Sequence, residues 1–448
     1  MKKLRHGLAS VLAFQGTFAI VQLLQVPILL AAWGADQYGV WLLFQIVQMI
    51  AARSDFGLAI AASKEMTIRL HKDNKSGAAS LFHTVLSTIA GLQLVALPLL
   101  IAGATAAATY WSVDLTPGDI IKTAFWMGVA GIAMALMELL YGVFYSLGRQ
   151  PAGMTIRTFG QWAWLGALAT AVLSGCDIPQ TAMAAALGLS LQLIVAVALL
   201  VKSQNIYTFS LGTQFGEVQK LIAPSLSLAT LPAAQIINLA VPRLVMSSIG
   251  GAALVALFNA HRQLTRVISI VFGLALAFEP RMTVAKANGN RAEFLRFAIA
   301  CQLLVGVLAL LGAAAILLLA HPIFTAWTNG KIDGVTLLFV ILSIAALGEA
   351  IWRAVLSGLT AANEHTRIGT TYLVVNLIGM SAVAYLIPTS ASPTIYLSLA
   401  VLLIEMVTLI AVVRSFLATN SVTFGEWCSI AGQVIAETIS LLGKAVGR

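Results

Sequence analysis

The sequence predicts an all-α polytopic membrane protein with about twelve transmembrane helices. The first observation is composition: of the 448 residues, 59% are hydrophobic and 10% are charged, and the mean hydropathy is +0.93. A water-soluble domain of this size does not tolerate so apolar a composition. The second observation is that long apolar stretches recur along the whole chain. Each stretch can cross about 30 Å of hydrocarbon as a helix.

The apolar stretches, read in order, give the expected helices. The first six helices are expected at 8–33, 38–62, 79–110, 120–147, 156–174 and 181–201. The second six are expected at 221–248, 253–284, 294–320, 334–360, 368–388 and 394–416. After them, the tail from 424 to 447 alternates apolar and polar residues at roughly helical spacing, which favours an amphipathic helix on the membrane surface. The expected parts are an N-terminal lobe, a C-terminal lobe and a cytoplasmic tail, at 1–215, 216–416 and 417–448.

The distribution of Lys and Arg predicts the orientation. Of 26 such residues, 19 fall at the termini and in loops on the side of the N-terminus, five fall inside expected helices, and only Lys122 and Lys331 lie on the other side. Basic residues in short loops stay cytoplasmic, so both termini are expected in the cytoplasm and the protein in the cell inner (plasma) membrane. We interpret the net charge of +9 as this topology signal and expect no nucleic-acid partner.

An internal repeat relates the two halves. The segment FGLAIAASKEMTI at 56–68 aligns with FGLALAFEPRMTV at 272–284, with seven of thirteen positions identical. Beyond these segments, Asn74 aligns with Asn290. Six helices per half is an even number, so the second half enters the membrane in the same orientation as the first. Such a parallel repeat predicts two six-helix lobes around a central cavity that opens to one face at a time, which is an architecture of transporters.

The stretch WGADQYGVWLLFQIVQMIAARSDFGLA at 33–59 resembles the first two helices of polysaccharide and O-antigen flippases. In that family a Tyr-Gly pair opens helix 2 and an Asp-x-Gly-Leu element closes it; the matching residues here are Tyr38, Gly39, Asp55, Gly57 and Leu58. The resemblance implies membership of the superfamily that also holds multidrug and toxin extruders. It further implies a flippase of a polyprenyl-diphosphate-linked oligosaccharide for the synthesis of O-antigen, lipopolysaccharide or another surface polysaccharide.

The alternative is a multidrug and toxin extrusion-type cation antiporter, which shares the twelve-helix plan. No GxxxxGK followed by Ser or Thr occurs, so we expect no ATP use, no cofactor, and an H⁺ or Na⁺ gradient as the energy source. We expect a transporter and not an enzyme, because membrane polymerases and glycosyltransferases generally need a sizeable outer loop. The expected partners are membrane lipids and the polyprenyl-linked glycan, with a polysaccharide polymerase and chain-length proteins as candidates.

Arginines inside the expected helices are the candidates for binding substrate. An Arg at the bilayer centre costs at least about 2.5 kcal/mol, so a buried one usually faces a partner or a wet cavity. Asn259, Arg262 and Arg266 share, with Ser269, an arc of about 80° on helix 8. Guanidinium forks suit phosphate oxygens, so this stripe could hold a diphosphate. The further candidates are Arg53, Arg243 and Arg353. The alternative for all of them is pairing with Glu or with backbone carbonyls to hold helices together.

Acidic residues inside the same helices are the candidates for ion coupling. Burial favours the neutral form of a carboxyl group, which can then carry a proton or bind Na⁺. Glu138 is the first candidate, followed by Asp55 and Glu405. Asp55 could instead cap a helix or pair with Arg53. Glu349, a fourth candidate, is four residues from Arg353, which is also the spacing of a structural ion pair. The sequence suggests no metal site.

Overall fold

A computed structural model describes residues 2–109, 115–203, 214–362, 364, 366–387 and 392–446. These residues form helices joined by short turns, and no strand occurs among them. The chain forms two compact units. Unit 1 comprises Met1–Ala260, Phe324–Asp333 and Met380–Thr394. Unit 2 comprises His261–Ile323, Gly334–Gly379 and Ile395–Arg448.

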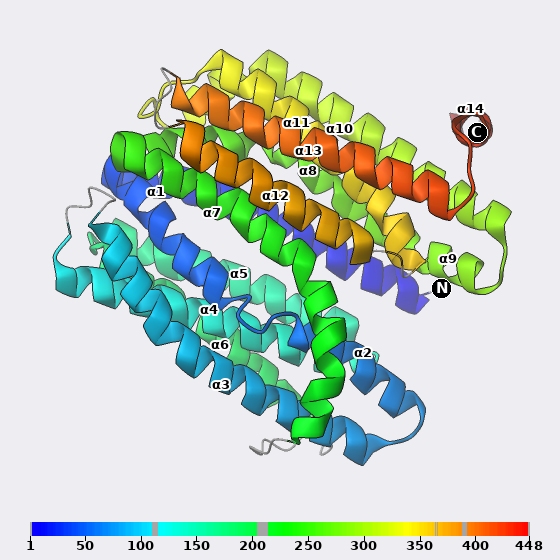
Figure 1. Cartoon of the computed structure of the whole chain (residues 1–448), viewed down its shortest axis with the longest axis horizontal. Coiled ribbons are helices and arrows are strands. Elements are labelled where there is room, and N and C mark those ends of the chain that lie inside the picture. The colour runs from blue at the N-terminus through cyan, green and yellow to red at the C-terminus, as the bar shows by residue number, and fades with distance from the viewer. Residues whose placement is uncertain are drawn as a thin grey trace. The chain divides into compact units, whose positions relative to one another are not determined.

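Figure 1 shows the helices in chain order from blue to red. The first six are α1 (Lys2–Ala51), α2 (Leu58–His71), α3 (Lys75–Ala108), α4 (Pro117–Ser146), α5 (Gln150–Leu173) and α6 (Ile178–Ser203). Next come α7 (Phe215–Thr265), α8 (Val267–Ile270), the 3₁₀ helix η1 (Val271–Leu274), α9 (Ala275–Ala287) and α10 (Arg291–Trp327). The last four are α11 (Thr336–Ala361), α12 (Thr366–Leu386), α13 (Pro393–Thr419) and α14 (Phe424–Val446).

The two longest helices are each broken at a glycine. In α1 the break is at Gly34, with φ 75° and ψ −174°. In α7 it is at Gly250 and Gly251, and Gly251 has φ 68° and ψ −167°. Glycine adopts a positive φ without a steric cost, so each break needs only one or two residues. These breaks confirm the boundaries expected from the sequence between helices 1 and 2 and between helices 7 and 8.

The number of membrane-length helices agrees with the prediction. Within the described residues, nine helical segments are long and apolar enough to cross a membrane. Two of them, of 39 and 59 residues, contain the glycine breaks and therefore hold two spans each. Helix α5, with 24 residues, has the length of a span but is not among these nine. With α5 counted, six helices of transmembrane length precede α7 and six run from α7 to α13, as expected. Helix α14, with 23 residues, follows them.

The expected extents of helices 2 and 8 were wrong. Helix 2 was expected over 38–62, but α1 ends at Ala51 and a turn precedes α2. In that turn Phe56 and Gly57 both have positive φ, at 48° and 79°, which ends a helix. Helix 8 was expected over 253–284, but the 3₁₀ helix η1 interrupts it. Apolar pattern alone hides both events, because the residues on either side of each break are apolar.

Each unit has its own core. In unit 1, buried side chains of α2 to α6 pack with Leu221 near the start of α7. In unit 2, α8, α9, α10 and α11 meet through small residues. The small ones are Ala275, Cys301, Ala309, Ala313, Ala346, Ala350 and Ala354. Small side chains let helix backbones approach closely, which is how membrane helices associate without a hydrophobic driving force.

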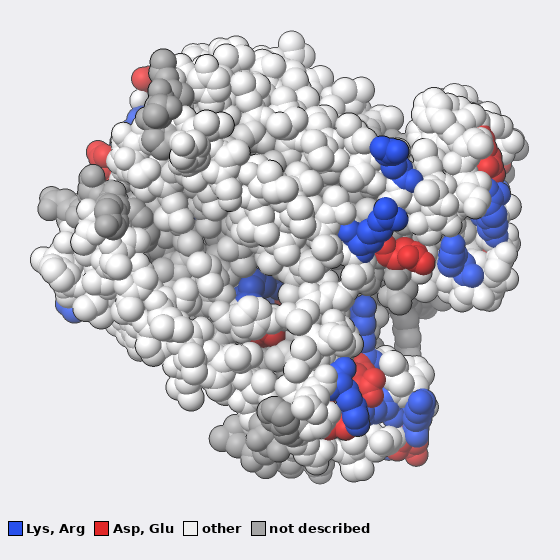
Figure 2. Space-filling view, viewed as in Figure 1, with Lys and Arg blue, Asp and Glu red and all other residues white. Residues whose placement is uncertain are grey.

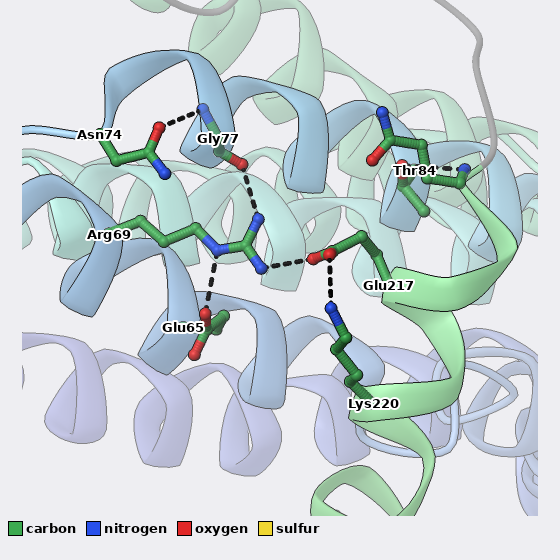
Figure 3. Close-up of polar contacts among 8 residues, drawn as sticks. Glu65, Arg69, Asn74, Gly77, Thr84, Glu217 and Lys220 are labelled. Carbon is green, nitrogen blue, oxygen red and sulfur yellow. Dashed lines mark hydrogen bonds and ion pairs between the residues drawn. The ribbon is translucent and has the colours of Figure 1, made fainter.

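Charged residues are sparse on the surface in view. Figure 2 shows a broad uncharged area with most Lys, Arg, Asp and Glu gathered at its margins. One of these gatherings, in unit 1, fastens the start of α7 to the α2–α3 turn (Figure 3). There Arg69 donates to Glu65 Oε1 at 2.9 Å, to the carbonyl of Gly77 at 3.0 Å and to Glu217 of α7. Lys220 also donates to Glu217, at 3.1 Å. We call these residues the α7 clamp.

The tail forms the expected helix, α14. The lobes expected at 1–215 and 216–416 stay a prediction, because the compact units describe packing and not the repeat. Unit 1 extends to Ala260. This extension has a physical reason: the start of α7 packs with helices of the first half through Leu221 and the α7 clamp, and Arg243 further along α7 bonds to α1.

Candidate functional site

Unit 2 contains a cluster of charged side chains within its apolar helices. Helix α11 contributes three of its members, Glu349, Trp352 and Arg353. Residues three and four apart lie on one face of a helix, so these side chains point in similar directions. Arg353 donates to Glu349 Oε1 at 2.9 Å, and both side chains are nearly buried. The pair expected from the sequence is therefore present.

Aromatic rings surround the Arg353 guanidinium. Its central carbon lies 4.7 Å from the centroid of Phe272 and 4.9 Å from that of Trp352. Such cation–π contacts, together with the carboxylate of Glu349, offset part of the cost of burying the charge. Removing one partner of the buried pair would leave an uncompensated charge. The contact of Arg353 with Phe272 links α11 to η1.

Glu405 of α13 is the most deeply buried acidic residue of the cluster, with 3% of its surface exposed. Its carboxylate accepts hydrogen bonds from Trp352 Nε1 at 2.7 Å and from the Tyr372 hydroxyl of α12 at 3.1 Å. The two rings are also in contact, with centroids 5.0 Å apart. Three helices thus converge on one carboxylate. Both of these donors are neutral, so they can orient the group without fixing its charge.

Two further arginines complete the cluster. Arg262, at the end of α7, is only 9% exposed, and Arg266 follows it between α7 and α8. The charges that act on Arg262 include those of Arg266, Glu349 and Glu405. The structure therefore brings together five residues that the sequence singled out one by one. We call Arg262, Arg266, Glu349, Arg353 and Glu405, with Trp352 and Tyr372, the unit 2 charge cluster.

Glu138, the first candidate for coupling, lies in unit 1. It pairs with Arg157 of α5 at 3.2 Å. The same guanidinium lies over the rings of Phe14 and Tyr141, at 4.8 and 5.1 Å. The sequence places Arg157 at the start of the fifth helix and counts it as a loop charge, whereas the structure places it inside α5. The pair thus joins α4 to α5 inside the helix bundle.

Arg243 and Asn259, expected to bind substrate, form a network within unit 1. Arg243 donates to the Leu42 carbonyl of α1 at 3.0 Å and to Asn259 Oδ1 at 3.1 Å. Asn259 in turn donates to the Tyr38 hydroxyl at 3.1 Å. These buried bonds tie α1 to α7, which fits the structural alternative stated for the arginines. The hydrogen bonds of Asn259 thus join residues of unit 1.

Arg53 and Asp55 lie in the turn between α1 and α2, although helix 2 was expected to contain both. Arg53 was expected inside helix 2, but it lies exposed in the turn between α1 and α2, because the helix ends at Ala51. Asp55 is buried in the same turn, and its Oδ2 accepts a hydrogen bond from the amide of Ala59 at 3.1 Å. An acidic side chain at that position satisfies an amide of the first turn of α2, so Asp55 acts as a cap.

Trp352 and Tyr372 are the members of the site that sequence reasoning missed. Trp352 had a usable signal, because it lies three residues from Glu349 and its indole N–H needs an acceptor when buried. Tyr372 had none, since its partner is 33 residues away. In the described part of the chain, no three His, Cys, Asp or Glu side chains gather in a way that could hold a metal ion.

The helices and the buried charges together define a multi-pass membrane protein whose fold is that of the MATE transporters of the MOP superfamily. The chain superposes on an inward-facing multidrug resistance MATE transporter with a TM-score of 0.71 and 15% identity, covering 90% of this chain and 94% of that one. An outward-facing structure of such a transporter gives 0.69 and 14%, covering 94% and 96%. A eukaryotic MATE transporter gives 0.65 and 13%, covering 97% and 98%.

At 13–15% identity these likenesses establish the fold. No protein-family model matches the sequence, and the curated proteins give no match either. The superfamily expected from the sequence agrees with these neighbours, whereas the polysaccharide flippase family within it has no support from them.

Proposed function

We propose that this protein is an ion-coupled exporter that works by alternating access. The observation that carries the proposal is the MATE-type fold over at least 90% of the chain. Solved structures of that fold include an inward-facing and an outward-facing conformation. Alternating exposure of one site needs no ATP-binding domain, and the sequence has no motif for one.

We propose the unit 2 charge cluster as the coupling site, with Glu405 as the residue that exchanges the proton or Na⁺. Its carboxylate is buried and held by neutral donors, so it can be discharged in one state and charged in the other. Glu349, which is held by Arg353, stays charged throughout. Glu138 becomes the second candidate, because it already has a cationic partner in Arg157.

The orientation expected from Lys and Arg belongs to the same proposal. We place the protein in the cell inner membrane with both termini in the cytoplasm, because the sequence assigns 19 of the 26 basic residues to that side. The α2–α3 and α9–α10 turns lie on the cytoplasmic side in this arrangement. Membrane lipids are the partners that this location requires.

For the cargo, we propose first an amphipathic drug-like or toxic compound, since the structural neighbours are multidrug transporters. A second candidate is the polyprenyl-diphosphate-linked oligosaccharide, with a polysaccharide polymerase and chain-length proteins as its partners. The specific observation in its favour is that the unit 2 charge cluster holds three arginines and two glutamates. This excess of arginine over glutamate suits a diphosphate better than a cation.

The test uses purified protein in proteoliposomes with an imposed pH or Na⁺ gradient. We expect uptake of a fluorescent organic cation that follows the gradient, and we expect Glu405→Gln to abolish it while the protein inserts normally. Glu364→Gln is the matched control, because this exposed residue lies in the loop between α11 and α12. Uptake that persists after both gradients are collapsed would contradict ion coupling.

Two transport assays, with variants of Arg262 and Arg266, decide between the two cargoes. Rescue of surface polysaccharide in a flippase-deficient cell, without cation uptake in vesicles, would replace the first candidate by the second. In that case Ala at both Arg262 and Arg266 should abolish rescue, whereas Lys at both should keep part of it, because a point charge still attracts phosphate. Cation uptake without rescue would retain the first candidate.

A further inference from the structure

Within unit 2, one side of helix α14 is held against α10. Arg291 of α10 forms a bidentate ion pair with Glu426, at 2.9 and 3.2 Å. Arg296 of α10 pairs with Glu437. In addition, Trp427 Nε1 donates to Gln302 Oε1 at 2.9 Å. All three partners belong to the first third of α10. In Figure 1, α14 is seen end-on, whereas α10 and α13 run across the picture, so α14 lies crosswise to these two membrane spans.

The opposite side of α14 is apolar and exposed. Phe424 is 70% exposed, Ile435 48% and Ile439 64%, and Cys428 is exposed as well. At 100° per residue these four side chains fall within an arc of about 60°. The two glutamates that bind α10 lie about 180° from the middle of that arc. The ion pairs with α10 therefore hold this apolar strip away from the α10 arginines.

We infer that α14 is an interfacial helix whose strip of Phe424, Cys428, Ile435 and Ile439 inserts into the surface of the lipid bilayer. Three observations favour lipid as the occupant. The helix lies crosswise to spans that cross the membrane, which is the orientation of a helix in the interface plane. Its exposed large apolar side chains line one face, and its two glutamates lie on the other. Both glutamates are neutralised by Arg291 and Arg296, so anionic headgroups do not repel the helix.

The position of α14 on the bilayer does not depend on which cargo the protein carries. In physical terms, the lipid surface buries the strip that the protein leaves exposed, and the ion pairs fix the depth of α14 relative to α10. Motion of α10 would then move α14 along the membrane surface. The consequence is that the strip contacts lipid in the full-length protein in a bilayer.

Cys428 is a labelling site within the strip, because it is exposed while Cys301 is buried. In the full-length Cys176→Ser protein, an NBD fluorophore on Cys428 reports on the strip. In proteoliposomes of phosphatidylcholine brominated near the headgroup end of its acyl chains, we expect loss of NBD fluorescence relative to unbrominated lipid. Aqueous iodide should have little effect. The control carries Cys428→Ser and Gln433→Cys, which moves the fluorophore to the exposed polar side, where iodide should quench and bromine should not.

A second variant keeps the test independent of folding. Ser at Phe424, Ile435 and Ile439 should retain insertion and monodispersity but lose quenching by brominated lipid at Cys428. Quenching by iodide alone at Cys428 in the unaltered strip would overturn the inference, since the strip would then face water. Protection from both quenchers would overturn it as well, because a protein surface would then be the occupant.

Discussion

The α2–α3 turn of unit 1 and the α9–α10 turn of unit 2 follow the two copies of the internal repeat, and most of their backbone hydrogen bonds correspond. In the first, the amide of Asn74 donates to the carbonyl of Arg69 at 2.9 Å. In the second, the amide of Asn290 donates to the carbonyl of Ala285, also at 2.9 Å. Both pairs stand at the offset of 216 residues that aligns the two sequences. The repeat therefore preserves a local structure and not only a helix pattern.

The side chains that begin the next helix agree too. The Asn74 side chain accepts from the amide of Gly77 at 2.8 Å and caps α3. The Asn290 side chain accepts from the amide of Glu293 at 3.2 Å in the same way. An Asn at this position satisfies an amide that the helix leaves open. The aligned asparagines are thus explained by one shared role.

The attachments of the two turns differ. In unit 1, Arg69 before the turn binds Glu217 of α7, and both side chains are less than one fifth exposed. In unit 2, Arg291 after the turn binds Glu426 of α14, and the pair is largely exposed. The two halves therefore share the turn but differ in the helix that is attached to it. One copy fastens a membrane helix, and the other fastens a helix outside the spans.

The largest expected effect concerns Gly57 and its aligned partner Gly273. Gly57 has φ 79°, and a Cβ there would lie 2.6 Å from the carbonyl oxygen of Ser225. Gly57→Ala should therefore destabilise the protein by at least about 1–2 kcal/mol from the backbone conformation alone, with the steric overlap added. Gly273 lies in η1, where Ala needs no positive φ. Thermal unfolding in detergent measures both variants.

We expect a clear fall in melting temperature for Gly57→Ala and a smaller change for Gly273→Ala. Gly91→Ala serves as the matched control, because this helical glycine has open space around the Cβ position. Equal falls for Gly57 and Gly273 would mean that the two copies of the break share one conformation. That outcome would contradict the claim that Gly57 needs a positive φ and Gly273 does not.

The next effect compares the two arginines. Arg69→Gln should cost about 1–2 kcal/mol, since it removes charge-assisted hydrogen bonds from a partly buried site. Arg291→Gln should change global stability much less, because exposed ion pairs contribute little. Its effect should instead be local, as faster hydrogen exchange of the α14 amides. Equal losses of global stability from the two variants would contradict the distinction drawn between the attachments.

The sequence predicts the helices well because their signal is local. A run of apolar residues is visible in the chain, and so are Gly34 and the pair of Glu349 with Arg353, which lies within a single helix. It fails where structure depends on distant partners. Nothing near Asn259 in sequence shows that it bonds Tyr38, which is 221 residues away.

The same reason explains Arg53. The apolar pattern resumes at Phe56, so the sequence predicts one helix through Arg53, but α1 ends at Ala51 and the left-handed backbone at Phe56 and Gly57 separates it from α2. Convergence of α11, α12 and α13 on Glu405 likewise depends on packing between helices. Five site residues were found from the sequence because buried charges are rare. Their grouping was not, because it is a property of the bundle.

The smallest effect is a pH dependence of the α14 attachment. The hydrogen bond from Arg291 lowers the pKa of the Glu426 carboxyl below its ordinary value of 4.5. A carboxyl whose pKa is lower in the attached state stabilises attachment above its ordinary pKa, and this contribution is lost as the pH falls through the lowered value. Exchange of the α14 amides, corrected for the intrinsic pH dependence, should therefore be constant from neutral pH to about pH 5 and rise only below it. Glu426→Gln should exchange faster at neutral pH and lose that rise. Arg69→Gln, in the other copy of the turn, should keep the whole profile. A profile that Glu426→Gln leaves unchanged would show that this pair does not hold α14.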